Sequence, residues 1–274
     1  MKELTFLFWN TNKNTNFIPV KDIIEHYDVD VIILAECDFK TQELVVALNE
    51  KKALYFDENG LAQCEKIKII TKFPPKFLVP ILEDNRYSIR TLSLPLLDSI
   101  LIVGIHLPDK GRSSSDNQLL ASRSLYSDIE KMESEHKSEK TIIIGDFNMN
   151  PFENGMVSMN GLNAVMSESI AMTGSRIVQD REFKYFYNPM WSLYGDVGNN
   201  VPGSYFYRKN ENLPWNVFDQ VLLRPALIPN FDKSSLTFLD SIGTESLLSK
   251  SGYPDKKFSD HLPLIFKLKL NKKL

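Results

Sequence analysis

The sequence predicts a mixed α/β fold built on more than one β-sheet. Short apolar runs rich in Ile, Val, Leu and Phe recur along the whole chain and are typical of buried strands. Segments with helical spacing lie between some of these runs in the first third, whereas the middle and the end are richer in strands. This uneven order favours several sheets over one parallel doubly wound sheet.

The expected elements follow from the period of the apolar residues. Expected strands cover residues 4–9, 30–36, 66–71, 89–97, 99–106, 141–146, 218–224 and 262–270. Three expected helices carry apolar residues three and four positions apart, which gives each helix one face to bury. Those faces hold Val20, Ile23, Ile24 and Tyr27 in the first helix, Leu44, Val45 and Leu48 in the second, and Leu120, Ile129 and Met132 in the third, which follows "SSSD".

The segment from about Glu153 to Asn200 fits neither pattern well. "MVSMNGLNAVMSESI" is compatible with a helix or a pair of loops, and the aromatic "FKYFYNPMWSLYGD" is expected to pack on the body of the protein. We find no internal repeat, low-complexity tract or Gly/Ser linker, and no shift in composition marks a boundary. We therefore expect one domain over residues 1–274, with this segment as an insertion.

Composition narrows the class of protein. The chain has 274 residues, 43% of them hydrophobic, which is enough for a sizeable core without disulfides. Two distant cysteines, Cys37 and Cys64, make neither a disulfide framework nor a structural zinc site. The N-terminus lacks the shape of a secretory signal, and no apolar window approaches the length of a membrane span. We expect a cytoplasmic protein.

The net charge of −3 is not that of a protein held on nucleic acid by charge alone. It remains compatible with a nuclease, because a bound divalent cation changes the field at the site.

Polar side chains follow or precede the expected strands at their ends. If these ends converge, the side chains form the concave polar site that hydrolytic chemistry needs. The residues concerned are Asn10, Glu36, His106, Asp146, Asn148, Asp219, Asp260 and His261.

Each of these residue types has a task in phosphodiester cleavage. Glu36, Asp260 and Asn10 offer the oxygen ligands that Mg²⁺ or Mn²⁺ prefers, and such a cation acts as a Lewis acid on a phosphoryl oxygen. Asp146 can accept a proton from the attacking water while Asn148 orients it. His261, held by Asp219, can stabilise the negative charge of the transition state. His106 is a further donor or general acid, with Glu65 as its expected partner.

Each signal has an ordinary structural explanation when it is taken alone. "GDFN" is compatible with a simple turn, a single histidine at a strand end is more often structural, and "SDH" resembles a cap. The complete order Asn, Glu, His, Gly-Asp-x-Asn, Asp and Ser-Asp-His, each beside a strand, is improbable by chance and favours a catalytic site.

With these motifs the chain resembles the endonuclease/exonuclease/phosphatase superfamily, which includes deoxyribonucleases, apurinic endonucleases, deadenylases, sphingomyelinases and inositol polyphosphate phosphatases. The similar stretches run from "FWN" through "ILAE", "GIHLP", "IIIGDFNMNP" and "FDQVLL" to "FSDHLPL". The resemblance implies a deoxyribonuclease I-like four-layer sandwich of two packed β-sheets flanked by helices, with Mg²⁺ or Mn²⁺ at one edge. It implies Glu36 as principal metal ligand near Asn10 and Asp260, Asp146 and Asn148 aligning the nucleophile, and Asp219 paired with His261.

Several positions depart from individual branches of the superfamily. Apurinic endonucleases typically carry tyrosine where this chain has His106, and aspartate where it has Asn12. Inositol phosphatases usually show an arginine where "PWNVFDQV" has Gln220. Glu65 lies where deoxyribonucleases place the glutamate that partners their histidine. Because His106 and Asn12 depart from the pattern of apurinic endonucleases, a dedicated abasic-site enzyme is disfavoured.

Two substrate classes remain open from the sequence. A nuclease is favoured by basic groups near the expected site, Lys110 and Arg112, and by aromatic and basic residues in "SYFYRKN", which is also compatible with an ordinary strand and turn. A small-molecule or lipid phosphoesterase is favoured mildly by the acidic pI near 5.9, although no amphipathic basic helix or lipidation motif indicates work at a membrane. A catalytically inactive binding module is disfavoured, because every expected position holds a competent residue.

Overall fold

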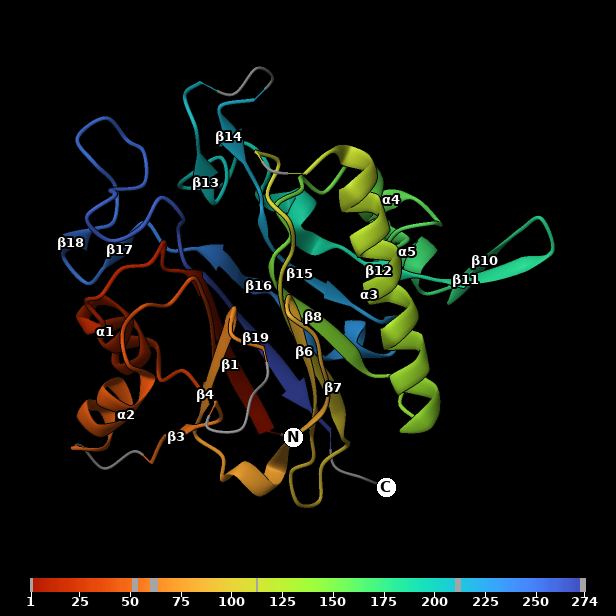
Figure 1. Cartoon of the computed structure of the whole chain (residues 1–274), viewed down its shortest axis with the longest axis horizontal. Helices are drawn as coiled ribbons and strands as arrows, with labels where there is room; N and C mark the ends of the chain where they lie inside the picture. The colour runs from red at the N-terminus through yellow and green to blue at the C-terminus, as the bar shows by residue number, and fades with distance from the viewer. Residues whose placement is uncertain (1, 51–53, 60–63, 112, 210–212, 272–274) are drawn as a thin grey trace.

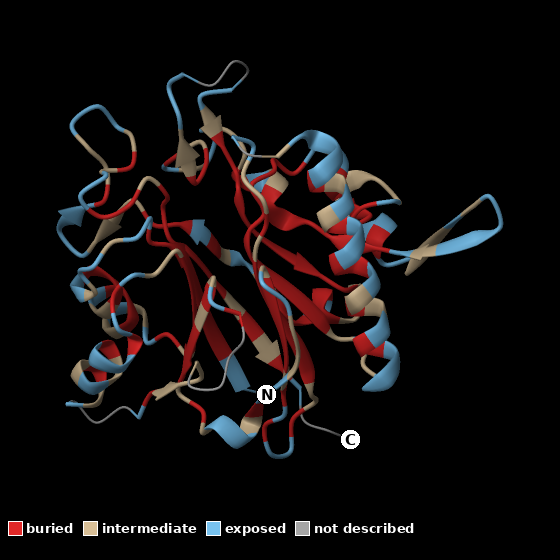
Figure 2. Cartoon of the chain, in the orientation of Figure 1, coloured by how far each residue is buried: buried red, intermediate tan, exposed pale blue. Residues whose placement is uncertain are grey.

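A computed structural model describes residues 2–50, 54–59, 64–111, 113–209 and 213–271 of the chain. Two large β-sheets pack face to face, with α1 (Ile18–Tyr27) and α2 (Thr41–Asn49) outside one sheet and α3 (Ser115–Glu135) outside the other (Figure 1). The central strands of both sheets are buried and the helices expose one face (Figure 2). The predicted four-layer sandwich of mixed α/β class is confirmed.

The first sheet is centred on the N-terminal strand. β1 pairs antiparallel with β19 on one side and parallel with β2 on the other. Its residues from Leu4 to Phe8 are buried, because α1 and α2 cover one face and the second sheet covers the other. In the described part of the chain the strand order is β16 (Phe231–Phe238), β19 (Leu264–Leu270), β1 (Lys2–Asn10), β2 (Val31–Ala35), β4 (Ile67–Thr71) and β3 (Phe56–Asp57).

The second sheet shows the alternation of side chains that a doubly covered sheet requires. In β8, Ile142 and Ile144 join the core between the sheets, whereas Ile143 packs toward α3. Because both faces are buried, the strand reads as an uninterrupted aliphatic run. The described order is β5 (Leu78–Glu83), β6 (Tyr87–Leu92), β7 (Ile100–His106), β8 (Thr141–Asp146), β15 (Asp219–Leu223), β12 (Phe186–Tyr187) and β9 (Ala164–Val165).

Helix α3 begins at a serine cap and buries one stripe. Ser114 accepts a hydrogen bond from the Asn117 backbone N–H, as an N-cap does. Ile129 and Met132 are buried as predicted, but Leu120 is 59% exposed and lies on the opposite face, so its assignment to the apolar face is wrong. The buried stripe continues instead through Leu125. No helix among the described residues is long and apolar enough to cross a membrane.

Two expected segments differ in the structure. The run 89–97 is not one strand: β6 ends at Leu92, and a turn that contains Pro95 follows, because proline interrupts strand pairing. The segment 153–200 does pack on the body, since β12 pairs with β15 and β9 extends that edge of the sheet. Its remaining elements are α4 (Asn154–Val157), α5 (Glu168–Ala171), the hairpin β10 (Ser175–Val178) and β11 (Arg181–Lys184), which projects from the body (Figure 1), and the 3₁₀ turn η2 (Pro189–Leu193).

Short elements complete the described chain. Two more hairpins are seen in Figure 1, the first at the top and the second at the left of the view, and two 3₁₀ turns connect strands. The hairpins are β13 (Tyr205–Phe206) with β14 (Trp215–Asn216) and β17 (Ser241–Ile242) with β18 (Glu245–Ser246), and the turns are η1 (Pro75–Phe77) and η3 (Pro225–Asn230).

Gly145 is required inside β8 by the close approach of the neighbouring strand. A Cβ placed there would lie 2.1 Å from the Ile105 carbonyl oxygen, so the backbones would have to separate. We expect Gly145→Ala to lower the free energy of unfolding by about 3 kcal/mol in urea titrations. Gly104→Ala is the matched comparison, because its new methyl would meet only side-chain methyls, of Ile67 at 3.0 Å and Ile33 at 3.3 Å. Equal losses in both variants would contradict this explanation.

Candidate active site

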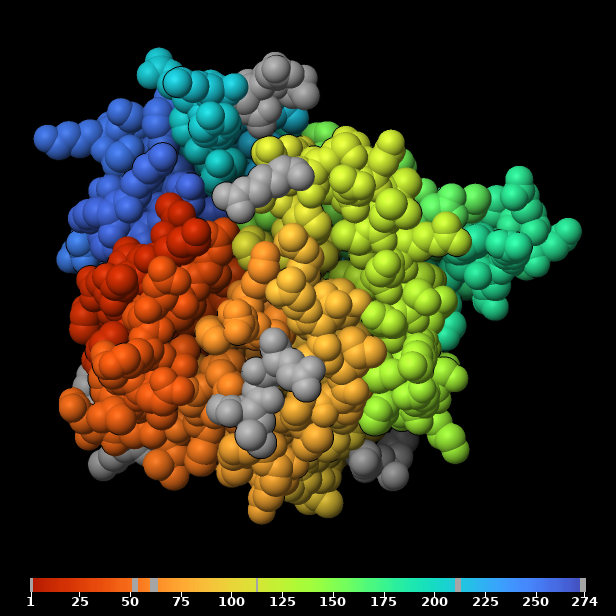
Figure 3. All heavy atoms as spheres, viewed as in Figure 1, coloured from red at the N-terminus to blue at the C-terminus, as the bar shows by residue number. Residues whose placement is uncertain are grey.

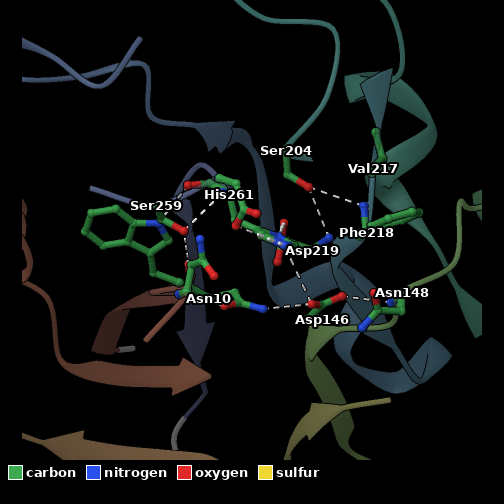
Figure 4. A network of polar contacts seen from close by, with 12 residues as sticks. Asn10, Asp146, Asn148, Ser204, Val217, Phe218, Asp219, Ser259 and His261 are labelled. Atoms are coloured by element: carbon green, nitrogen blue, oxygen red, sulfur yellow. Dashed lines mark hydrogen bonds and ion pairs between the residues drawn. The ribbon is translucent and has the colours of Figure 1, made fainter. Parts of the chain in front are cut away.

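The polar strand ends meet at one edge of the sandwich. β1 ends at Asn10, β7 at His106 and β8 at Asp146, and Glu36 follows β2 directly. Asp146 pairs with His106 across the parallel β7–β8 ladder and with Asp219 across the antiparallel β8–β15 ladder. The antiparallel pairing explains why Asp219 reaches this edge although it begins its strand. The structure therefore brings together residues at the ends of five strands, and Figure 4 shows Asn10, Asp146 and Asp219 among them.

Asp219 and His261 form a buried hydrogen-bonded pair. The Nδ1 of His261 lies 2.8 Å from Oδ2 of Asp219, and both side chains are almost inaccessible to solvent. The backbone N–H of Asp219 donates to the Ser204 hydroxyl at 3.2 Å, and the Trp9 indole N–H donates to the His261 carbonyl at 2.9 Å. The Asp219 carboxylate thus fixes the ring, and the backbone contacts fix the two residues that carry the pair (Figure 4).

The charges around His261 favour its protonated form. Burial alone would lower the pKa of His261, but the charge and hydrogen bond of Asp219, with Asp146 and Asp260 nearby, raise that pKa to about 10. The imidazole therefore carries a positive charge at neutral pH. Its free Nε2 lies 4.0 Å from Oδ2 of Asp146, which directs that charge into the site.

Asp146 has both carboxylate oxygens placed by hydrogen bonds. Oδ1 accepts from the backbone N–H of Asn148 at 2.8 Å, and Oδ2 accepts from Nδ2 of Asn10 at 2.9 Å. Asn148 has a positive φ of 51°, which asparagine tolerates better than most residues. Its side-chain amide donates to the Leu107 carbonyl at 3.0 Å, so the turn of "GDFN" is locked against the end of β7.

Glu36 and His106 form the other half of the site. The Nε2 of His106 lies 3.4 Å from Oε1 of Glu36 and 3.8 Å from Oδ2 of Asp146. The Nδ2 of Asn10 lies 3.4 Å from the same Glu36 oxygen, so Asn10 presents its amide donor to the two carboxylates. Glu36 has a φ of 46°, a conformation that is costly for this residue and is often found at functional sites.

Oxygen donors at this edge fit a hard divalent cation. The carboxylates of Glu36 and Asp260 keep 29% and 24% of their side chains accessible, and Asp260 makes no hydrogen bond with a described residue. Asp146, Asp219 and His261 also offer ligand atoms within 4.8 Å of one another. The latter group fits a metal less well, because the hydrogen bond between Asp219 and His261 already uses two of those ligand groups.

The residues predicted to contact substrate are placed apart from this centre. Lys110 forms an ion pair with Glu153, and its ammonium lies 5.2 Å from the centre of the Phe218 ring. Glu65 is exposed before β4, and no contact joins it to His106 among the described residues, so the expected pairing is replaced by that of His106 with Glu36. Arg112 lies outside the described residues.

Several side chains that support the site carry no clear signal in the sequence. The Ser259 hydroxyl donates to the Asn10 carbonyl at 2.7 Å and accepts from the His261 backbone N–H at 3.0 Å, which ties β1 to the "SDH" turn. Tyr205 packs on the His261 ring with 4.7 Å between ring centres. Its place in "SYFY" is compatible with contact to substrate or with an ordinary strand, and indicates no contact with a histidine. For Ser259, the sequence indicates only that it is the first residue of "SDH".

Comparison with known proteins decides the family. The model of the "Endonuclease/Exonuclease/phosphatase family" matches residues 7–261, which is most of the chain. The chain belongs to this family. No curated protein matches it in sequence.

Solved structures share the fold at low sequence identity. TDP2 from D. rerio, complexed with single strand DNA product, is 16% identical with a TM-score of 0.55 and covers 99% of this chain and 100% of its own. ANGEL2, described as a 2′,3′-cyclic phosphatase, is 14% identical with a TM-score of 0.60. The superposition covers 97% of this chain and 94% of ANGEL2. The catalytic domain of human Nocturnin, with bound sulfate anion, is 16% identical with a TM-score of 0.56 and covers 98% and 95%.

Proposed function

We propose that this protein is a divalent-metal-dependent phosphodiesterase, and specifically a nuclease that cleaves DNA or RNA. The observation that carries the proposal is the joined set of Asp146, Asp219 and His261 beside Glu36. It combines a carboxylate base, a charged imidazole and a partly exposed carboxylate at one edge. Each of these three functions accelerates hydrolysis of a phosphodiester by water.

Some of the residues act on the attacking water, and others act on the phosphoryl group. Asp146 accepts a proton from the attacking water, which Asn148 helps to orient. The protonated His261 donates toward a phosphoryl oxygen and stabilises the negative charge that gathers there in the transition state. Asp219 keeps the imidazole charged and in one orientation. His106 supplies a second donor from the Glu36 side.

Glu36 and Asp260 are the residues that would hold the divalent cation, with Asn10 between Glu36 and Asp146 as a positioning donor. A bound Mg²⁺ or Mn²⁺ supplies Lewis acidity toward a phosphoryl oxygen. The partial exposure of both carboxylates leaves this end of the site open to the substrate.

A nucleic acid is favoured over a small phosphoester by the aromatic side of the site. Tyr205 lies over His261 and stacks on Phe218 with 5.2 Å between ring centres, and Tyr207 beyond it is 48% exposed. Because the Tyr205 ring already packs on His261 and Phe218, the exposed Tyr207 is the ring that can accept an unpaired base, whatever the sequence. The similarity to TDP2 in complex with single strand DNA product supports the same class.

The test is cleavage of supercoiled plasmid and of single-stranded DNA and RNA oligonucleotides with Mg²⁺ or Mn²⁺, with and without a chelator. We expect cleavage that the chelator abolishes.

We also expect Glu36→Gln to raise the Mg²⁺ concentration for half-maximal rate at least about 10-fold, while Glu43→Gln, on the exposed face of α2, leaves it unchanged. Release of phosphate from inositol phosphates or cleavage of sphingomyelin, without cleavage of nucleic acid, would support a small-molecule or lipid phosphoesterase instead.

A further inference from the structure

Two basic residues occupy the register positions beside Glu36 and His106. In the β2–β4 ladder Ala35 pairs with Ile67, so the next step of this antiparallel ladder places Lys66 beside Glu36. In the β6–β7 ladder Tyr87 pairs with Ile105, and the backbone N–H of His106 donates to the Arg86 carbonyl at 2.8 Å. The two sheets therefore each deliver one cation to the same side of the site.

The packing of the sheets keeps these two strand ends together. A Cβ added at Gly104 in β7 would lie 3.0 Å from a methyl group of Ile67, the first residue of β4. Lys66 directly precedes Ile67, and Arg86 directly precedes the residue that pairs with Ile105. Glycine at position 104 thus allows the β4 and β7 backbones to approach where the two cations emerge. Figure 3 shows the orange and the yellow parts of the chain side by side in the middle of this face.

The two cations lie close enough to repel each other, while Glu36 and Asp109 attract Lys66 from a distance. Among the described residues, neither side chain forms an ion pair or a hydrogen bond. Like charges held together at a half-buried position are unfavourable unless a binding anion offsets them.

We propose that Lys66 and Arg86 form a subsite for a second phosphate of a polynucleotide strand, next to the phosphate that is cleaved. This inference rests on the proposed function. Lys66 and Arg86 hold the backbone of the strand on the Glu36 side of the site.

Phosphate chemistry suits this pair of side chains. Arginine offers a planar fork for two phosphate oxygens, and lysine adds a point charge with three donors. A single small diester has only the cleaved phosphate and gains nothing from a second phosphate subsite. The expected signature is therefore a preference for a strand over a minimal diester, with a marked dependence on salt.

The experiment measures binding and cleavage separately. Binding of a fluorescent single-stranded phosphorothioate oligonucleotide is followed by anisotropy at several salt concentrations, and cleavage is compared between an oligonucleotide and bis(4-nitrophenyl) phosphate. We expect Lys66→Gln and Arg86→Gln each to weaken oligonucleotide binding about 10-fold and to reduce the slope of log affinity against log salt by about one. The loss of kcat/KM should be larger for the oligonucleotide than for the small diester.

Matched controls remove charge at distant exposed positions. Lys131→Gln, on the outer face of α3, and Arg181→Gln, on the projecting hairpin, should leave binding, salt slope and both activities unchanged. Oligonucleotide binding that is absent in the wild type, or is equal in Lys66→Gln, Arg86→Gln and the controls, overturns the subsite. If the wild type still cleaves oligonucleotides in the latter case, the nuclease proposal stands and only the subsite is rejected. If the wild type cleaves the small diester but cleaves no nucleic acid, both the nuclease proposal and the subsite are rejected.

Discussion

Replacing Asp146 with asparagine is expected to lower kcat for phosphodiester cleavage about 10³-fold. The carboxylate lies between the two histidines, with Oδ2 3.8 Å from Nε2 of His106 and 4.0 Å from Nε2 of His261. Asparagine keeps the shape but cannot accept the proton of the attacking water. Single-turnover cleavage of a defined oligonucleotide at saturating Mg²⁺ measures this loss without interference from product release.

The structure also predicts a cost in stability for the same substitution. Both carboxylate oxygens accept hydrogen bonds, from the Asn148 backbone and from the Asn10 amide, and asparagine can replace only one acceptor. We expect Asp146→Asn to lower the free energy of unfolding by about 2 kcal/mol, which leaves a folded protein that thermal denaturation can confirm. Asp22→Asn, on the exposed side of α1, is the control for removal of a carboxylate. Full activity in folded Asp146→Asn would exclude Asp146 as the base.

The sequence predicts the site residues because each lies where a buried strand ends. Uninterrupted aliphatic runs such as "TIIIG" are needed to fill a doubly covered sheet, and a polar residue directly after one must reach an edge. Local pattern is therefore sufficient to locate Asn10, Glu36, His106 and Asp146. The placement of Asp219 beside Asp146 depends on an antiparallel ladder between distant segments, which no local pattern in the sequence indicates.

Contacts set by tertiary structure are harder to predict. Sequence similarity suggests Glu65 as the partner of His106, but the chain turns Glu65 toward solvent and the sheet packing brings Glu36 instead. The reason for the glycine before Asp146 is also set by tertiary structure. In the sequence, a glycine at this place suggests a strand that ends sharply at a turn. In the structure Gly145 lies inside β8, and a side chain there would collide with the carbonyl oxygen of Ile105. Ser204, which bridges two segments, has no pattern of its own in the sequence, whereas Ser259 is marked only by its place in "SDH".

The second large effect is expected from Asp219→Asn, which removes the charge that keeps His261 protonated. We expect kcat at pH 8 to fall about 10³-fold, although asparagine can still accept a hydrogen bond from the ring. Without the carboxylate, burial becomes the main influence and lowers the pKa of His261. The ring is then neutral at pH 8 and cannot stabilise the phosphate charge.

The pH dependence distinguishes this role from a merely structural one. Since the folded-state pKa of His261 is raised from 6.5 to about 10, its stabilisation of the fold is complete below about pH 6.5 and is lost as the pH rises toward 10. The wild-type rate should accordingly fall on the alkaline side only near pH 10. In Asp219→Asn the alkaline fall should move below neutral pH, so the deficit relative to wild type shrinks as the pH is lowered from 8 to 6.

A matched control separates charge at the site from charge elsewhere. Asp98→Asn removes a carboxylate that pairs with Lys140 and should leave the pH–rate profile unchanged. The alkaline limb is diagnostic because misfolding of Asp219→Asn would scale the rate at every pH without moving that limb. An unmoved limb near pH 10 in a folded Asp219→Asn protein would show that His261 does not depend on Asp219 for its charge, and the imidazole would then lose its assigned role as the cationic donor to the phosphate.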